Sequence, residues 1–295
     1  MINPIIDGLE PVILADYECH VCEGPLWHPD EGRLYWLDIP QGRMFRLDPK
    51  TGKHEQVYEG RPVGGITIQK DGSLLLFMDR GSVAIWREGR ELEFVIDQID
   101  EEVDSRFNDV IADPEGRVFC GTMSSESHPG KLYRLDPDRS IQVVIPETGT
   151  ANGMGFSTDL SRMYFTDTGP RQIYVFDYNR KTGSISNQRN FSDPPPEQDG
   201  KPDGMTIDSD DYIWSARWDG SILVRLSPDG VEERRITFPA QKISCLTFGG
   251  DDLTDIFVTA AGGQDKKTNG PGAGALFHFN LGIPGKPEYR SNISL

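Results

Sequence analysis

Residues 201–208 read KPDGMTID and residues 150–157 read TANGMGFS, so each stretch places a carboxylate or a carboxamide directly before Gly-Met. Four further stretches share the order of a polar or small residue followed by an apolar segment: EGPLWH from Glu23, GGITIQ from Gly64, NDVIAD from Asn108 and SCLTFG from Ser244. The aligned first positions of the six stretches lie 41, 44, 44, 51 and 41 residues apart: Glu23, Gly64, Asn108, Asn152, Asp203 and Ser244. This nearly constant spacing predicts a repeat architecture.

A turn and a second strand-like segment follow each stretch, as in HPDEG-RLYWLDI at residues 28–39. Most units continue with a third segment, such as GKLYRLD at residues 130–136, and a polar fourth one. No segment has the long 3.6-residue apolar period of a helix. The pattern therefore predicts an all-β fold, a six-bladed β-propeller with four-stranded antiparallel blades around a central channel. We expect residues 1–295 to form this one domain, with ILADY at residues 13–17 adding a strand to the last blade.

The composition excludes several classes of function. The chain of 295 residues has a net charge of -17, which disfavours nucleic acid and anionic membrane surfaces as partners. No apolar run is long enough to span a membrane, and the N-terminal stretch MINPIIDGLEPVIL lacks the features of a signal peptide. We therefore expect a soluble, cytoplasmic protein that acts on a small molecule. The sequence does not predict the oligomeric state.

Four cysteines are present, and two of them, Cys19 and Cys22, form a CxxC pair. That spacing occurs in zinc sites and redox motifs. Because no second CxxC or ordered Cys-His run follows, we favour plain thiols or a local disulfide over a structural zinc site.

The first strand of each propeller blade lines the channel, so the six starting residues are expected at one mouth of it. Glu23, Asn108, Asn152 and Asp203 bring side-chain oxygens there, and two of the four are anionic at neutral pH. Clustered carboxylates repel each other unless a cation lies among them, so we expect a divalent metal ion. The alternative is that these residues are solvated loop groups or cap the turns that enter each strand.

Several of these stretches resemble motifs of the regucalcin (senescence marker protein), gluconolactonase and luciferin-regenerating enzyme family. The matching stretches are EGPLW, RFND from Arg106, GTM from Gly121, NGMGFS, PDGM and CLTFGG followed by FVTAA, and they occur in the order of the family. The resemblance implies a six-bladed propeller with a divalent metal held by Glu23, Asn152 and Asp203. It also implies that Arg106, Asn108 and Glu126 contact a sugar lactone.

Two features depart from that family pattern. Glu126 lies three residues after the Met of GTM, and its neighbours, SSES, differ from the family pattern. The glycine-rich stretch at residues 262–275 is either a lid over the mouth or a surface loop between strands.

Arg106 also has an alternative role. Instead of binding substrate, it would form a surface ion pair with Asp104 or Asp109.

The expected function is hydrolysis of a sugar lactone to an aldonic acid. A metal ion would polarise the lactone carbonyl, while Asp203 accepts a proton from the attacking water. Oxygen ligands favour calcium, although magnesium, manganese, zinc or ferrous iron also suit such a site. Two other functions stay open: a phosphotriesterase of the organophosphate-hydrolysing kind, and a calcium-binding regulatory protein without turnover.

Overall fold

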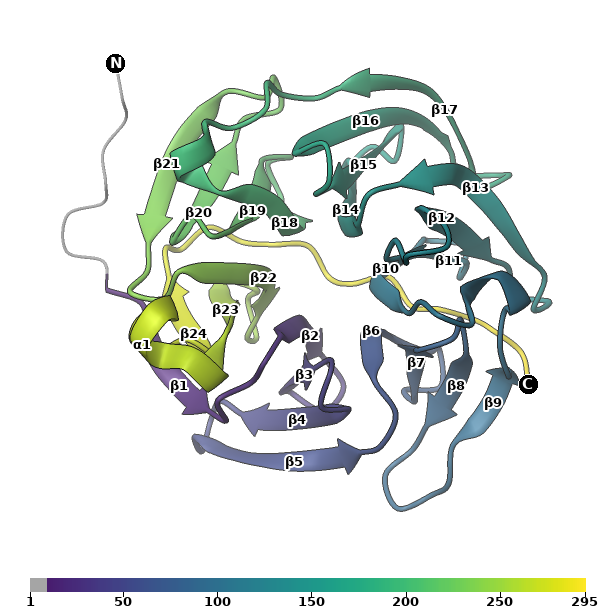
Figure 1. The fold of residues 1–295 in the computed structure, drawn as a ribbon, viewed down its shortest axis with the longest axis horizontal. Coiled ribbons are helices and arrows are strands. Elements are labelled where there is room, and N and C mark those ends of the chain that lie inside the picture. Colours follow the sequence, from purple (N-terminus) through teal and green to yellow (C-terminus); the bar gives the residue numbers. More distant parts are fainter. Residues whose placement is uncertain (1–9) are drawn as a thin grey trace.

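The computed structural model of the protein describes residues 10–295 and confirms the predicted six-bladed β-propeller. Six four-stranded antiparallel sheets surround a central channel, as the view down the shortest axis shows (Figure 1). Residues 1–9, which begin the stretch searched for a signal peptide, lie outside the described residues. Within residues 10–295, no helix is long and apolar enough to cross a membrane.

The first three blades follow the chain from the channel outward. Blade 1 contains β2 (Cys22–His28), β3 (Arg33–Asp38), β4 (Arg43–Asp48) and β5 (Lys53–Glu59). Blade 2 contains β6 (Val63–Ile68), β7 (Leu74–Met78), β8 (Val83–Trp86) and β9 (Glu93–Ile96). Blade 3 contains β10 (Phe107–Ala112), β11 (Val118–Thr122), β12 (Gly130–Leu135) and β13 (Ile141–Thr148).

Blades 4 and 5 repeat this order, and blade 6 takes its outermost strand from the start of the described chain. Blade 4 contains β14 (Ala151–Phe156), β15 (Arg162–Asp167), β16 (Gln172–Asn179) and β17 (Ser184–Asn190). Blade 5 contains β18 (Lys201–Ile207), β19 (Ile213–Trp218), β20 (Ile222–Leu226) and β21 (Glu232–Thr237). Blade 6 contains β22 (Lys242–Gly249), β23 (Asp255–Ala261), β24 (Ala275–Asn280) and β1 (Val12–Asp16).

The ring is closed by β1, which pairs antiparallel with β24, as predicted for the ILADY stretch. This pairing joins the first described strand to the last one, so both ends of the described chain are held in blade 6. Short helices occupy some of the connections: 3-10 turns at Asp100–Glu102, Glu197–Asp199 and Gly263–Asp265, and the helix α1 at Lys266–Asn269.

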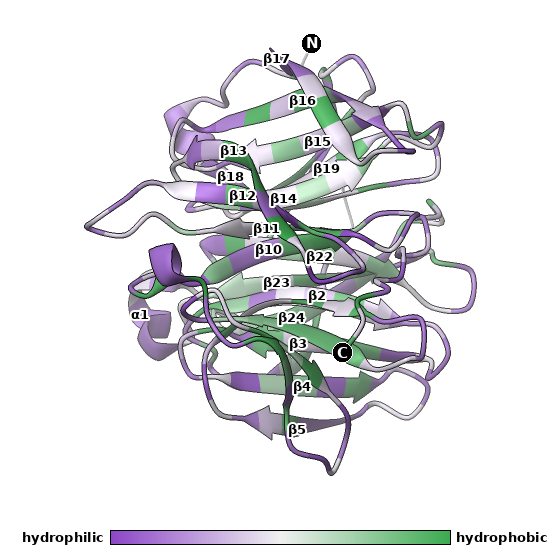
Figure 2. Ribbon diagram, turned by 90° about the vertical axis from the view of Figure 1, so that its right-hand side faces the viewer, coloured by the Kyte–Doolittle hydropathy of each residue, from purple (hydrophilic) through white to green (hydrophobic). Residues whose placement is uncertain are grey.

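The hydrophobic core is divided among the interfaces between neighbouring blades. Six clusters of buried residues form, one in each interface, for example Tyr164 of blade 4 with Met205 and Ile213 of blade 5. Figure 2 shows hydrophobic stretches along the strands and mostly hydrophilic connecting loops. The blades are therefore held by apolar contacts between their faces, which leaves the two ends of the channel free for polar groups.

A C-terminal segment, residues 281–295, crosses the end of the channel opposite the starts of the inner strands (Figure 1). It contacts the turns that follow those strands: Gly285 donates to Leu253, Ser209 to Pro284, and Asn292 to Gly116, all through backbone groups. Arg290 donates to both carboxylate oxygens of Asp30 at 2.7 Å. The segment thus joins turns from blades 6, 5, 3 and 1 across one face of the propeller.

Candidate active site

Every inner strand has a register shift near its first residues. In four of them the irregular stretch includes or begins at a predicted site residue: Glu23 in β2, Asn108 in β10, Asn152 in β14 and Asp203 in β18. A bulge adds a residue to one strand and changes where its side chains point, and bulges are frequent beside active sites. At these positions the bulges turn polar side chains toward the channel.

The glycine that follows a site residue is required by the packing of the inner strands. A Cβ on Gly153 would lie 2.1 Å from the backbone nitrogen of Met205, and one on Gly204 would lie 2.4 Å from the sulfur of Cys245. The inner strands of adjacent blades therefore approach too closely for a side chain. This explains why Asn152 and Asp203 are each followed by Gly.

A chain of hydrogen bonds connects the site residues of blades 3, 4 and 5. The Nδ2 of Asn108 donates to the backbone oxygen of Ala151 at 2.9 Å and to Oδ1 of Asn152 at 3.2 Å. The Nδ2 of Asn152 donates to Oγ1 of Thr168 at 2.9 Å, and that hydroxyl donates to the backbone oxygen of Pro202 at 2.7 Å. The chain fixes the orientation of the Asn152 side chain and ends on the residue before Asp203.

Arg106 lies at the same mouth and contacts Asn108. Its Nη1 donates to Oδ1 of Asn108 and to the backbone oxygen of Phe107, both at 2.8 Å. Asp104, one of its expected ion-pair partners, instead contacts His128 and Ser127 on the surface. The pKa of Arg106 is lowered to about 10, because burial disfavours the charge more than nearby Glu23, Asp109 and Asp203 favour it. Arg106 is therefore a cation held among carboxylates.

Three buried carboxylates share this mouth. Burial and then the charge of Asp109 raise the pKa of both Glu23 and Asp203 well above the usual range. Burial also raises the pKa of Asp109 itself to about 7, against the opposing effect of Arg106. Three carboxylates and one guanidinium leave two uncompensated negative charges when all are ionised. A divalent cation would balance them.

The predicted metal ligands fit such an ion in their chemistry. The Oδ2 atom of Asp203 is buried and has no hydrogen-bond partner among the described residues. Within residues 10–295, no three His, Cys, Asp or Glu side chains are grouped so as to hold a metal by themselves. The predicted set differs from such a group, because Asn152 contributes a carboxamide oxygen beside the carboxylates of Glu23 and Asp203.

Three other predicted positions, Gly64, Ser244 and Glu126, have surroundings different from those of the four polar residues at the mouth. Gly64 brings no side chain, and its strand approaches the Phe107 carbonyl so closely that a Cβ would lie 1.9 Å from it. Ser244 is fully buried, and its hydroxyl donates to the backbone oxygen of Cys22 at 2.5 Å. Glu126 is exposed in the loop between β11 and β12, three residues after Met123, whose backbone nitrogen donates to Arg106.

The stretch at residues 262–275 connects β23 to β24 and contains α1. Its backbone bonds to the chain before β2, since Gly262 donates to His20 and Gly263 to Cys19. In Figure 1, α1 lies over blade 6 and beside β1, away from the centre of the ring. In this structure the stretch is therefore a loop packed on one blade.

Cys19 and Cys22 are free thiols, both fully buried. They belong to the apolar cluster between blades 6 and 1, with Trp27 and Phe257. Burial, together with the neighbouring Cys19, raises the pKa of the Cys22 thiol well above its usual value. Of the two favoured alternatives, these residues are therefore free thiols and do not form the local disulfide.

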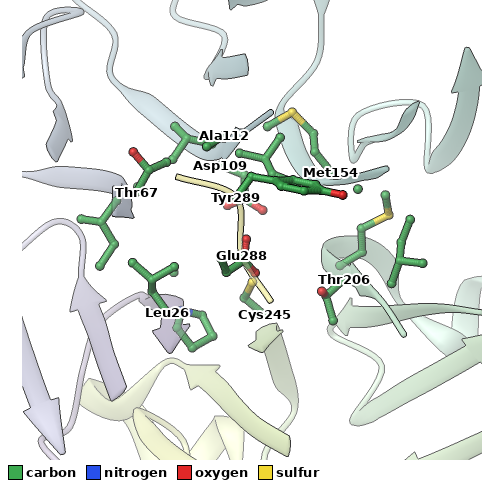
Figure 3. Close-up of a pocket in the computed structure, with 18 of the residues that line it drawn as sticks. Leu26, Thr67, Asp109, Ala112, Met154, Thr206, Cys245, Glu288 and Tyr289 are labelled. Atoms are coloured by element: carbon green, nitrogen blue, oxygen red, sulfur yellow. The ribbon is translucent and has the colours of Figure 1, made fainter. Parts of the chain in front are cut away.

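Below the mouth the channel holds a cavity of about 100 Å³, which is large enough for several water molecules. Side chains from all six blades line it, including Leu26, Thr67, Asp109, Met154, Thr206 and Cys245 (Figure 3). Glu288 and Tyr289 of the C-terminal segment also line this cavity. Asp109 thus faces both the mouth residues and the interior of the channel.

Two residues of the site were not identified from the sequence. Asp109 follows Asn108, and adjacent residues of a regular strand point to opposite faces, so only one of the pair was expected in the channel. The sequence feature that could have identified Asp109 is a second polar residue at the start of an otherwise apolar strand. Thr168 lies in the turn between β15 and β16, outside the six aligned stretches, and only its hydrogen bonds reveal its part in the site.

Comparisons with known proteins show the family to which this chain belongs. Residues 21–262 match the model described as SMP-30/Gluconolactonase/LRE-like region. The chain is 46% identical over 291 residues to pentonolactonase XacC of Haloferax volcanii, covering 96% of this chain and 98% of that protein. It is 31% identical to regucalcin of Xenopus laevis, covering 94% and 96%. A solved luciferin-regenerating enzyme superposes with a TM-score of 0.86 at 28% identity, covering 96% and 100%. The chain therefore belongs to the SMP-30/gluconolactonase/LRE-like family.

Proposed function

We propose that this protein is a divalent-metal-dependent lactonase that opens sugar lactones to aldonic acids. The observation that supports it most is the meeting of Glu23, Asn152 and Asp203 at one channel mouth, with Asp203 Oδ2 buried and unpartnered. The relative that is 46% identical over nearly the whole chain is named a pentonolactonase, which favours a lactone as the substrate class. Calcium is the preferred ion for such oxygen donors.

In this proposal Glu23, Asn152 and Asp203 hold the ion. When bound, a divalent ion supplies positive charge that polarises the lactone carbonyl. Asp203 also accepts a proton from the water that attacks the carbonyl carbon, and it returns that proton to the ring oxygen as the ester C–O bond breaks. The product is an open-chain hydroxy acid, so the atoms of one lactone and one water are conserved.

Arg106 and Asn108 orient the substrate beside this group. Both amide hydrogens of Asn108 are already donated to Ala151 and Asn152, and its Oδ1 accepts from Arg106. We therefore assign Asn108 chiefly to positioning its neighbours. The Nη2 and Nε atoms of Arg106 are left to donate to substrate oxygens. Glu126, exposed on the adjacent loop, keeps its proposed contact with a sugar hydroxyl.

The test is a screen of aldonolactones with chelator-treated protein to which calcium, magnesium, manganese, zinc or ferrous ion is restored in turn. We expect hydrolysis of five- or six-carbon lactones with at least one ion and none without it. A phosphotriester run in parallel measures the organophosphate alternative. Metal binding without turnover of any lactone would contradict the proposal and favour a binding protein without catalysis; a solved regucalcin is described as a calcium-binding protein.

A further inference from the structure

Arg217, near the end of β19, is a buried cation without a partner. Its side chain is 4% exposed, and neither Nε nor Nη1 has a hydrogen-bond partner in the described part of the chain. Arginine remains charged in proteins, and an unpaired buried charge strongly destabilises the folded state. Buried polar groups of this kind normally have a partner, which can be a water molecule or an ion.

The side chain lies in the interface between blades 4 and 5. Residues 213, 215 and 217 of β19 share one face of the strand, since side chains alternate along it. Ile213 packs with Tyr164 and Ile173 of blade 4. Arg217 therefore faces blade 4, at the end of β19 where it pairs with Pro202.

The charged groups around Arg217 supply less negative charge than positive charge. Arg235 occupies both nearby carboxylates: it donates to Asp199 at 3.1 and 3.2 Å and to Glu232 at 2.6 and 2.8 Å. Arg171 enters from blade 4, and its Nη2 is bonded only to backbone oxygens. Three guanidinium groups thus share two carboxylates, in a protein whose net charge is -17.

The burial and the neighbouring charges of Arg217 change its pKa. Its pKa is lowered to about 10, chiefly by burial. Glu232 and Asp199 oppose the shift, whereas Arg235 and Arg171 add to it. Arg217 nevertheless stays a cation at neutral pH, so the local excess of positive charge persists.

We propose that a small inorganic anion of the size of chloride binds at Arg217 between blades 4 and 5. The unpartnered Nε and Nη1 donate to it, and its charge compensates the third guanidinium. The occupant is small because Nε and Nη1 are closed off from solvent and the residue as a whole is only 4% exposed, which leaves little room for a sugar acid or a phosphate ester. A water molecule would satisfy the donors but not the charge.

The direct test is diffraction from crystals of the whole protein grown or soaked in sodium bromide, whose anomalous signal identifies the ion. We expect a bromide peak within hydrogen-bond distance of Arg217 Nε and Nη1. This measurement uses the unmodified chain and does not depend on any variant folding. An ordered site without anomalous signal is a water molecule and would overturn the proposal.

A solution test compares melting temperatures in sodium chloride and in sodium methanesulfonate at equal ionic strength, so that general screening is the same. At about ten times the dissociation constant, chloride should raise the melting temperature of the wild type by about 2 to 4 °C. Arg217→Met should lose this difference. Arg90→Met is the matched control, because Arg90 is exposed and far from this interface. A chloride-specific rise that persists in Arg217→Met would contradict the assignment.

Discussion

The two ends of the central channel are built from different kinds of sequence. The mouth consists of the first residues of the inner strands, which recur once per blade and carry Glu23, Asn108, Asn152 and Asp203. The opposite end is closed by one continuous segment, residues 281–295, that belongs to no repeat. The mouth holds carboxylates whose negative charge is not fully compensated. At the far end, most polar groups have hydrogen-bond or ion-pair partners. Function and stability are therefore expected to separate between the two ends.

The largest effect should follow from changing Asp203. Asp203→Ala removes a metal ligand and the proposed base, so lactonase activity should fall on the order of a thousandfold or more. The fold should persist, because this carboxylate makes no hydrogen bond through Oδ2 and is repelled by Asp109. Activity is measured by lactone hydrolysis and folding by thermal unfolding of the metal-free protein.

Asp229→Ala is the control for that prediction, since Asp229 is exposed in the turn between β20 and β21 of the same blade. This variant should leave both the lactonase activity and the thermal unfolding of the protein near wild type. Substantial lactonase activity in Asp203→Ala with metal present would rule out the proposed role of this residue. Loss of folding in that variant would instead show that the mouth is needed for stability, and the contrast between the two ends would fail.

The opposite result is expected at the far end. Ile293 of the C-terminal segment is 5% exposed and packs between blades 2 and 3 with Leu75, Val118 and Leu135. Ile293→Ala should lower the free energy of unfolding by about 2 to 4 kcal/mol, measured by denaturant titration. Turnover below the melting temperature should remain near wild type, because the mouth is unchanged.

Leu295→Ala provides the matched control, as Leu295 lies in the same segment but is 56% exposed. Its effect on stability should be within about 0.5 kcal/mol. If Ile293→Ala reduced turnover as strongly as it reduced stability, the two ends would be coupled through the channel and the comparison would need revision.

The difference between the ends also explains what could be predicted from sequence. The propeller, the strand order and the closing strand β1 follow from repeats and strand-like patterns, and all three are confirmed. The polar residues of the mouth could be selected because they occupy equivalent positions in several units. Asp109 was not predicted, because side chains of a regular strand alternate between its two faces. A bulge can turn two successive side chains into the channel, and the sequence pattern does not show where a bulge occurs.

The C-terminal segment could not be predicted for a different reason. Its sequence, LGIPGKPEYRSNISL, has no alternation and no counterpart in other units. Its contacts join residues more than two hundred positions apart, such as Gln69, whose side chain bonds to both the backbone oxygen and the backbone nitrogen of Ile293. Such pairings depend on the finished ring. The unpartnered Arg217 was equally invisible, because its burial depends on the packing of blade 4 against blade 5.

The smallest expected effect concerns the acidity of Glu288, which lines the channel from the far end. Burial raises its pKa from the ordinary 4.5 to about 7, while Lys286 opposes the shift. Between about pH 4.5 and 7 the folded protein therefore holds a proton that the unfolded chain has lost. Stability contributed by this group is present below pH 4.5 and is lost as the pH rises toward 7.

Glu288→Gln removes this dependence, so the variant should gain about 2 to 3 kcal/mol relative to wild type between pH 5 and pH 8. The measurement is the difference in urea midpoint between the two proteins across that range, in which contributions common to both cancel. Asp210→Asn, an exposed change on the same face, should follow the wild-type curve. Parallel curves for Glu288→Gln and wild type would show that this carboxylate is solvated, and the far end would then be open to water.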